Sequence, residues 1–317
     1  MDKVHPYLVE QLTSRGYLCE TILKISHDEF VSLNDDYIGL IIRSKFNVDK
    51  EAIASKNNLK FIVRIGSGVE HIDLSLAEAN GIQIITTPEG NAPAVAEHCL
   101  GMLLTALKKI STADQEVRKG EWLREKNKGA ELSSQTVGII GFGHTGKAFA
   151  ALLRAFGCEI LVYDKFKSGF NETYVKEVTL DELLQCATVI SLHINYLPEN
   201  HYFINKTLLQ KAKQKPIFIN TSRGLAVNTT DLIFALDEDY IAFACLDVLE
   251  YENVNLQIPL KTEWNDTLWR LTSNKNALLT PHTAGQTYDA ELKHAQTALE
   301  KIYFCQNLLD NIHNEPN

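Results

Sequence analysis

The stretch that decides the fold is Val137 to Ala148, VGIIGFGHTGKA. It predicts a short buried strand followed by the spacing Gly-x-Gly-x-x-Gly, at Gly141, Gly143 and Gly146, and then a helix. Gly141 permits a tight turn, Gly143 lets the backbone approach a pyrophosphate, and Gly146 lets the helix pack close to the strand. The helix would point free N–H groups and its positive dipole end at the phosphates. The stretch therefore predicts a dinucleotide site, with a simple glycine-rich turn as the alternative.

An acidic residue follows the next predicted strand. That strand, Cys158 to Tyr163, is succeeded by Asp164, 18 residues after Gly146. A carboxylate at this place can accept hydrogen bonds from the adenosine ribose hydroxyls and repel a 2′-phosphate. The cofactor predicted here is therefore NAD rather than NADP, although the neighbouring Lys165 weakens that preference slightly.

Composition limits the class of protein. A length of 317 residues favours two domains, and 45% hydrophobic with 22% charged residues allows each half its own core. The net charge of −9 argues against nucleic-acid binding, which needs a basic surface.

The same data bear on compartment and metal content. The six cysteines are scattered without CxxC or zinc-finger spacing, which is typical of small buried side chains in a reducing cytosol. We therefore predict no metal site. No apolar run reaches about 18 residues, and the N-terminus lacks the apolar core of a signal peptide. We expect a cytoplasmic protein without a membrane span.

Both halves of the chain alternate predicted strands with predicted helices, which indicates parallel sheets with right-handed crossovers. In the first half the predicted strands are Leu18 to Ile25, Tyr37 to Ile42, Phe61 to Ile65 and Ile82 to Thr86. In the second half they are Val137 to Ile140, Ile160 to Tyr163, Thr188 to His193, Pro216 to Asn220, Ile241 to Leu246 and Ala277 to Leu279. Six strands in one block match the size of a complete dinucleotide-binding domain. We expect Glu250 to Asn274 to be irregular, Tyr288 to Leu309 to form a closing helix, and the usual opening strand to be missing or very short.

Several reactive side chains follow predicted strands, where ligands bind in an open α/β sheet. Arg223 comes after a strand, and its planar guanidinium matches a carboxylate, unless it lies in a surface salt bridge. Asp247 ends an apolar strand, and Glu252 opens the irregular segment. His282 can exchange a proton near neutral pH, and a carboxylate beside it would orient the ring and raise its pKa. Taken alone, each of these residues fits a structural role better than a catalytic one.

Taken together, the motifs resemble the NAD-dependent D-2-hydroxyacid dehydrogenases. The resemblance runs from about Val4 to Ile302 and is nearest to the phosphoglycerate dehydrogenases, through Arg64 to Val69 and Gly120 to Leu132. The segments that carry it, in order, are Gly66 to Asp73, Val95 to Glu97, Gly141 to Gly146, Asp164, Ser191 to His193, Asn220 to Gly224, Leu246 to Val248 and Pro281 with His282.

The resemblance implies a fold, a reaction and a set of roles. It implies an α/β chain with a doubly wound Rossmann domain, residues 96–285, and a smaller flavodoxin-like substrate domain, residues 1–95 and 286–317. It implies that Arg223 binds substrate, that His282 is the acid/base and that Glu252 is its carboxylate partner. Backbone N–H groups would hold the substrate carboxylate at Ser67, Gly68 and Val69. The implied cofactor contacts, beyond the glycines and Asp164, are His144, Thr145, His193, Thr221, Ser222 and Asp247.

The sequence also departs from the family pattern. Asn253 and Asn195 stand where the family commonly has proline, and the interval from Glu252 to His282 is longer than usual. These departures put the shape of the site in doubt without removing a reacting group. No regulatory domain follows the closing helix, so serine feedback through such a domain is not expected.

The implied substrate is a small anionic D-2-hydroxy or 2-oxo acid bound in a cleft between the domains. For 3-phosphoglycerate, the best candidate, Arg43 and Arg64 are the predicted phosphate ligands, with ion pairs to acidic residues as the alternative. Glyoxylate, hydroxypyruvate and lactate remain open, as does an NAD-sensing binding protein on the same scaffold. Glu252 in place of an amide argues against formate oxidation. We expect a homodimer.

Overall fold

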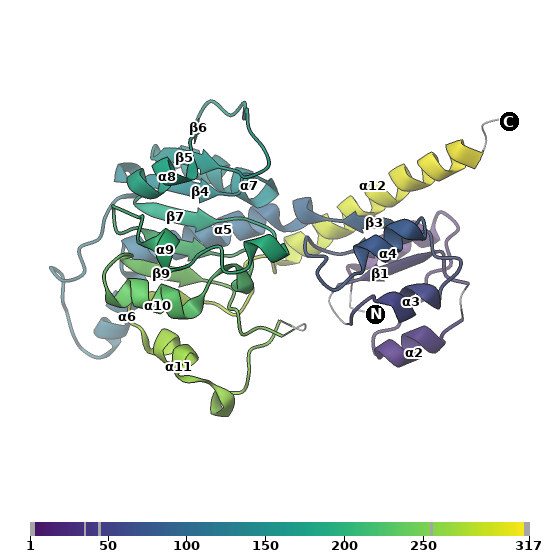
Figure 1. Ribbon diagram of the computed structural model, residues 1–317, viewed down its shortest axis with the longest axis horizontal. Helices are drawn as coiled ribbons and strands as arrows, with labels where there is room; N and C mark the ends of the chain where they lie inside the picture. Colours follow the sequence, from purple (N-terminus) through teal and green to yellow (C-terminus); the bar gives the residue numbers. More distant parts are fainter. Residues whose placement is uncertain (1–3, 35, 44–45, 254–255, 314–317) are drawn as a thin grey trace. The chain divides into compact units, whose positions relative to one another are not determined.

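The computed structural model describes residues 4–34, 36–43, 46–253 and 256–313 and divides into two compact units (Figure 1). Unit 1 comprises Met1–Asn91 and Gln286–Asn317, and unit 2 comprises Ala92–Gly285. The units divide after Asn91 and Gly285, whereas the prediction divided the chain at residues 95 and 285. Within the described residues, no helix has both the length and the apolar character needed to cross a membrane.

Unit 1 is built on a three-stranded parallel sheet in the order β1-β2-β3. Side chains alternate along β2: Phe61 and Val63 belong to one apolar cluster, and Ile62 belongs to another. Both faces of this sheet are therefore covered, as expected for a parallel sheet. Its strands are β1 (Gly39–Ile42), β2 (Phe61–Arg64) and β3 (Gln83–Thr86), and its helices are α1 (Pro6–Thr13), α2 (His27–Ser32), α3 (Lys50–Ala54), α4 (Leu74–Ala79) and α12 (Tyr288–His313).

The predicted strand from Leu18 to Ile25 is wrong. This segment has no strand: Leu18 is fully exposed and Leu23 is 53% exposed, whereas Ile22 and Ile25 pack at the core of unit 1, three residues apart rather than two as a strand requires. Helix α2, which the prediction missed, follows directly and begins with a capping box in which Ser26 and Glu29 satisfy each other's backbone N–H groups. The local capping chemistry therefore decides the structure here, rather than the apolar run before it.

Unit 2 is built on a seven-stranded parallel sheet in the order β10-β9-β8-β7-β4-β5-β6. The strand order reverses between β4 and β7, which creates the topological switch point of a doubly wound fold. Its strands are β4 (Thr136–Ile140), β5 (Glu159–Tyr163), β6 (Lys176–Glu177), β7 (Val189–Leu192), β8 (Ile217–Asn220), β9 (Phe243–Leu246) and β10 (Ala277–Leu279). This confirms the predicted two-sheet α/β fold and adds β6, whose two exposed residues carry no apolar pattern.

Helices cover both faces of this sheet. Along β4, Val137 and Ile139 belong to one apolar cluster and Ile140 to the other. The prediction of an irregular segment from Glu250 to Asn274 is wrong in part, because α11 lies within it and buries Leu268 and Leu271 at helical spacing. The helices are α5 (Pro88–Leu107), which begins in unit 1, then α6 (Ile110–Arg118), α7 (His144–Leu153), α8 (Leu180–Cys186), α9 (Lys206–Leu209), α10 (Thr229–Asp237) and α11 (Asp266–Ser273). Short 3₁₀ helices are η1 (Leu132–Ser134), η2 (Arg154–Phe156), η3 (Pro198–Asn200), η4 (Gly224–Ala226) and η5 (Lys261–Glu263).

Candidate active site

The glycine turn after β4 is shaped by close backbone contacts. Gly141 has φ 92°, and a Cβ there would lie 2.5 Å from the carbonyl oxygen of His193. A Cβ on Gly146 would lie 2.2 Å from the carbonyl oxygen of Gly141, so a side chain would push the helix off the strand. Gly143 has no neighbouring atom within 4 Å of its Cβ direction. The turn thus leaves open space at the one glycine where a pyrophosphate would approach.

The N-terminus of α7 has no side-chain cap, unlike those of several later helices of unit 2. Its N-cap is Gly143, which makes no side-chain cap hydrogen bond, and its first turn contains His144–Thr145. By contrast, α8, α10 and α11 are capped by Thr179, Asn228 and Asn265. A helix whose N-cap is glycine, with its positive dipole end, is suited to a phosphate.

Asp164 follows β5 and is held by three backbone N–H groups. Its Oδ2 accepts from Phe142 N at 2.8 Å, and its Oδ1 accepts from Phe166 N at 2.9 Å and Lys167 N at 3.1 Å. Two carboxylate oxygens offer about four acceptor sites, so capacity remains for a ribose hydroxyl. The carboxylate is therefore fixed in orientation before any cofactor binds.

His193 follows β7 and packs inside unit 2. Its ring is 8% exposed, lies 5.6 Å from the Phe149 ring and has its Nε2 2.8 Å from Ser191 Oγ. Burial lowers the pKa of His193 to about 4, so the ring is neutral at pH 7. The structure gives this imidazole a packing role, and its contact with the cofactor stays a prediction.

Asn220 shapes the loop that follows β8. Its buried Oδ1 accepts from both the backbone N–H and the hydroxyl of Ser222, and its Nδ2 donates to the carbonyl of Arg223. Arg223 Nη1 donates to the carbonyl of Ser222 at 2.8 Å, and Thr221 Oγ1 lies 3.1 Å from Cys99 Sγ. The loop is thus fixed internally, and Arg223 lies three residues after the end of β8, at the ligand-binding edge of the sheet.

His282 follows β10 and contacts Glu252 directly. His282 Nδ1 lies 2.5 Å from Glu252 Oε2, and Glu252 Oε1 accepts from Leu249 N at 2.6 Å. The two side chains are 23% and 12% exposed. An ionised Glu252 accepts from Nδ1–H, which leaves the Nε2 lone pair of His282 to take a proton. The structure therefore brings together the two residues that could form an acid/base pair.

Asp247 clamps the loop that carries His282. The carboxylate is 1% exposed, and its oxygens accept from Thr280 Oγ1 at 2.6 Å, Thr283 N at 2.9 Å and Ala284 N at 2.8 Å. The carbonyl of Asp247 accepts from His282 N at 2.7 Å. His282 has φ 52°, a strained conformation that a loop must be tightly held to maintain. Asp247 therefore has a positioning role that the sequence analysis did not assign.

Other residues in this network were also missed. His98 Nε2 lies 3.0 Å from Thr280 Oγ1, and Glu250 Oε1 accepts from Thr229 N at 3.0 Å. A hydrogen bond with Glu250 raises the pKa of Tyr202 to about 12. The only sequence signal was proximity to the quoted motifs, because each contact joins segments that are distant along the chain.

A loop in unit 1 presents backbone N–H groups after β2. Gly66 has φ 126°, its N–H donates to Thr87 Oγ1 at 2.8 Å, and its carbonyl accepts from Thr87 N at 2.9 Å. In the described parts of the chain, no hydrogen bond is donated by the backbone N–H of Ser67, Gly68 or Val69. Three consecutive N–H groups of this kind can bind a carboxylate.

The two candidate phosphate ligands also lie in unit 1. Arg43 follows β1, and its Nη1 is 3.8 Å from Glu291 Oε1, so the ion pair considered as the alternative is present in a loose form. Arg64 is the last residue of β2, and its Nη1 donates to the carbonyl of Ile65.

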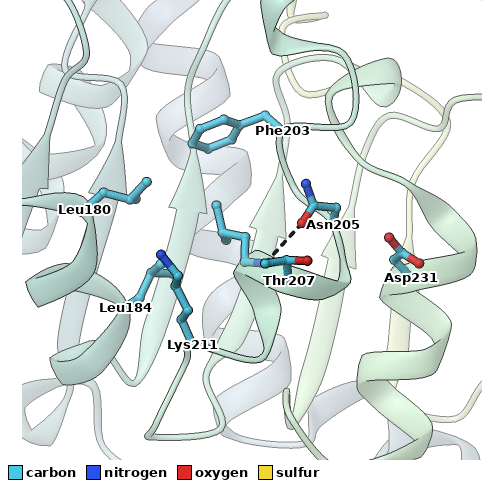
Figure 2. A pocket seen from close by; sticks show the side chains of 8 residues that line it. Leu180, Leu184, Phe203, Asn205, Thr207, Lys211 and Asp231 are labelled. Carbon is cyan, nitrogen blue, oxygen red and sulfur yellow. Dashed lines mark hydrogen bonds between the residues drawn. The ribbon is translucent and has the colours of Figure 1, made fainter.

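Figure 2 shows a surface pocket of unit 2 whose polar groups serve the scaffold. Asn205 Oδ1 accepts from Leu208 N at 3.1 Å, and Asp231 Oδ2 accepts from Lys206 N at 2.9 Å. Because these groups cap helices, the pocket offers little polar recognition for a ligand. It is lined by Leu180, Leu184, Phe203, Asn205, Thr207, Leu208, Lys211 and Asp231.

Comparison with known proteins gives the family. The model of the D-isomer specific 2-hydroxyacid dehydrogenase NAD binding domain matches residues 100–284. The chain is 33% identical to D-3-phosphoglycerate dehydrogenase of Archaeoglobus fulgidus over 93% of its own length and 54% of that protein. It is 32% identical to hydroxypyruvate reductase of Thermotoga maritima over 95% of each. Thus it spans about half the length of the first of these relatives and nearly all of the second.

A solved structure agrees with these matches. D-lactate dehydrogenase from Aquifex aeolicus, complexed with NAD and lactic acid, has a TM-score of 0.81 at 27% identity and covers 98% of this chain and 96% of its own. The NAD-binding domain thus lies in unit 2, and the chain belongs to the D-isomer specific 2-hydroxyacid dehydrogenase family.

Proposed function

We propose that this chain catalyses the reversible NAD-dependent oxidation of a small D-2-hydroxy acid to its 2-oxo acid. The observation that supports this most is the hydrogen bond between His282 Nδ1 and Glu252 Oε2 at the carboxyl edge of the NAD-binding sheet. A histidine so held can move a proton to or from a substrate hydroxyl.

The proposed mechanism assigns each step to a side chain. In the oxidation direction, the Nε2 lone pair of His282 removes the proton of the C2 hydroxyl, and Glu252 stabilises the resulting imidazolium. The first turn of α7 with Asp164 would hold NAD, which would supply the acceptor for the C2 hydride when bound. Arg223 binds the carboxylate and the C2 oxygen as it becomes a ketone, and the N–H groups of Ser67–Val69 hold the carboxylate.

The best candidate substrate is 3-phosphoglycerate, with 3-phosphohydroxypyruvate as the oxidised partner. Arg43 and Arg64 support this, because β1 and β2 are neighbours and place Arg43 and Arg64 at the same end of the sheet. The guanidinium of Arg43, which lies 3.8 Å from Glu291 Oε1, has the planar donor geometry that matches a phosphate. Phosphoglycerate dehydrogenases are among the relatives with 33% identity.

A second candidate is hydroxypyruvate or glyoxylate. The hydroxypyruvate reductase of Thermotoga maritima matches over 95% of both chains, and the glyoxylate reductase of Thermofilum pendens is 33% identical over 87% of this chain. These substrates carry no phosphate, so they would not require Arg43.

A substrate panel tests these proposals. Initial rates would be measured for 3-phosphohydroxypyruvate, hydroxypyruvate, glyoxylate and pyruvate, each with NADH and with NADPH. We expect turnover with NADH and the highest kcat/KM for 3-phosphohydroxypyruvate. Arg43→Ala should raise KM for that substrate about tenfold or more while leaving KM for glyoxylate nearly unchanged. Equal effects on both substrates would contradict the phosphate role, and no turnover with any acid would contradict the activity.

We further propose that the chain forms a homodimer through α6 and the segment after it. Within unit 2 this region exposes Ile110 by 53%, Val117 by 49%, Trp122 by 76% and Leu123 by 39%. Apolar side chains gathered in this way are typical of an interface. Trp122→Glu should convert the dimer to monomer in sedimentation velocity, and a monomeric wild type would refute the proposal.

The six unpaired cysteines support a cytoplasmic location.

A further inference from the structure

His294 is a buried histidine of α12 that joins the loop after β2 through one intervening side chain. It is 4% exposed, and its Nδ1 lies 2.7 Å from Thr87 Oγ1. The same hydroxyl accepts from Gly66 N at 2.8 Å. Because a hydroxyl has one proton, Thr87 can donate it to Nδ1 while accepting from Gly66. With His294 in its Nε2–H tautomer, the three groups form a directed chain, Gly66 N–H to Thr87 O–H to His294 Nδ1.

Local packing fixes the imidazole in this arrangement. A Cβ on Gly90 would lie 2.4 Å from His294 Nδ1 and 2.9 Å from its Cα, so only glycine lets α12 come this close to the start of α5. All of these residues belong to unit 1. The close approach leaves the ring little freedom to turn away from Thr87.

The charges around His294 keep its ring neutral. Burial is the largest cause that lowers the pKa of His294 to about 4, and the positive charges of Arg43 and Arg64 act in the same direction. A hydrogen bond with the Thr87 backbone and the negative charge of Glu89 in α5 act in the opposite direction. Glu291, on the same helix as His294, is paired with Arg43. A neutral ring has one nitrogen lone pair, and in the Nε2–H tautomer this lone pair is on Nδ1, where it accepts from Thr87.

We propose that His294 is a positioning residue for substrate binding, acting through Thr87 to hold the Gly66 N–H and thereby aim the N–H groups of Ser67–Val69 at the substrate carboxylate. This inference rests on the proposed function, which assigns the carboxylate to that loop. Since Gly66 has positive φ, a loop freed at this point has other backbone conformations to adopt. Loss of the acceptor would therefore weaken substrate binding without touching the hydride or proton steps.

Two variants separate hydrogen bonding from packing. His294→Leu removes the acceptor at similar volume, and His294→Asn places an amide oxygen near the position of Nδ1. We expect His294→Leu to raise KM for the 2-oxo acid about tenfold, with kcat and KM for NADH within about twofold. His294→Asn should recover most of the wild-type KM. An unchanged KM in His294→Leu, or equal defects in both variants, would overturn the inference.

A binding measurement keeps the test independent of turnover. Oxalate would be titrated by calorimetry into NADH-saturated full-length protein, and His294→Leu should bind it about tenfold more weakly. Thr87→Val should give the same weakening, and the double variant should add little, because both act through one chain of hydrogen bonds. Wild-type oxalate binding without turnover would sink the proposed function alone. Equal oxalate affinity in His294→Leu and the wild type, or a wild type that does not bind oxalate, would sink this inference.

Discussion

Two strand-end loops of this molecule are held by the same means and present opposite chemistry. The loop after β2 in unit 1 and the loop after β10 in unit 2 each contain a residue with positive φ, Gly66 at 126° and His282 at 52°. Each is fastened by a buried side chain distant along the sequence, Thr87 in the first and Asp247 in the second. Yet the first presents backbone N–H groups, whereas the second presents an imidazole.

The difference shows how a fold can separate binding from chemistry. In unit 2, the Asp247 carboxylate accepts hydrogen bonds from the backbone N–H groups of Thr283 and Ala284. These N–H groups already have an acceptor, so the group that this loop presents for reaction is the imidazole of His282. In unit 1, the N–H groups of Ser67–Val69 donate to no acceptor among the described residues, and the loop carries no proposed acid or base. We expect the first loop to govern substrate affinity and the second to govern turnover.

The largest effect should come from removing the reacting side chain. His282→Ala should lower kcat about 10²–10⁴-fold, the usual contribution of positioned proton transfer, while NADH still binds. Steady-state rates and NADH fluorescence titration measure the two properties. His27→Gln, a histidine change in unit 1, is the matched control and should stay within about twofold of wild type. Wild-type turnover in His282→Ala would remove this residue from the mechanism.

Breaking the clamp should cost stability as well as activity. Asp247→Ala leaves the buried N–H groups of Thr283 and Ala284 without an acceptor, at about 1–3 kcal/mol each. We expect the free energy of unfolding in urea to fall by about 3 kcal/mol. The matched control is Asp181→Ala, which removes an exposed ion pair with Lys211 and should cost less than about 1 kcal/mol. A similar loss of unfolding free energy in both variants would contradict the role of Asp247 in holding this loop.

A smaller effect should appear in cofactor choice. Asp164→Asn keeps one acceptor oxygen for the turn but removes the negative charge that we expect to face the ribose. The ratio of kcat/KM for NADH over NADPH should fall about tenfold, which corresponds to one charged hydrogen bond and the loss of repulsion. Competition between the two cofactors at fixed 2-oxo acid measures this ratio. An unchanged ratio would mean that other residues select the cofactor.

The smallest effect should be a pH-dependent stabilisation confined to unit 1. Hydrogen bonds first to Asp49 and then to Asp28 raise the pKa of His27 above 6.5, and His27 in turn lowers the pKa of Asp49 below 3.8. The contribution of His27 is full below pH 6.5 and is lost as pH rises through its folded pKa. That of Asp49 is present above pH 3.8 and is lost on further acidification through its folded pKa. The pair therefore stabilises most between these limits.

His27→Gln should accordingly lower the melting temperature more at about pH 5.5 than at about pH 8.5. The free energy of unfolding should fall by less than about 1 kcal/mol, because the pair is near the surface. Asp28→Asn, which leaves the shorter contact with Asp49 intact, should cost less at the lower pH. The account of this pair would be wrong if the deficit of His27→Gln were equal at both pH values.

The sequence could predict the strands and the residues at their ends, because both follow from local periodicity. Runs such as Val137–Ile140 indicate where the sheet lies, and a parallel sheet then gathers Asp164, Arg223 and His282 at one edge of unit 2. One exception, Leu18–Ile25, has the composition of a strand, but Leu18 and Leu23 are exposed while Ile25 is buried, and which side chains reach the core is not a local property.

The supporting contacts could not be predicted for the same reason. Thr87 and His294 are 207 residues apart, and Asp247 and Ala284 are 37 apart, so neither pairing leaves a periodic signal. Helix α11 was missed because the segment before it is irregular, although Asn265 offered a capping residue. The sequence thus predicts which groups react, while the structure shows which contacts hold these side chains and their loops in place.

The most direct test of the division between the two loops is a comparison of steady-state kcat and KM for Thr87→Val and His282→Ala with the same 2-oxo acid. The account predicts that Thr87→Val raises KM about tenfold with kcat within about threefold of wild type, and that His282→Ala lowers kcat at least about a hundredfold. Thr87→Val lowering kcat as deeply as His282→Ala, with KM unchanged, would contradict it.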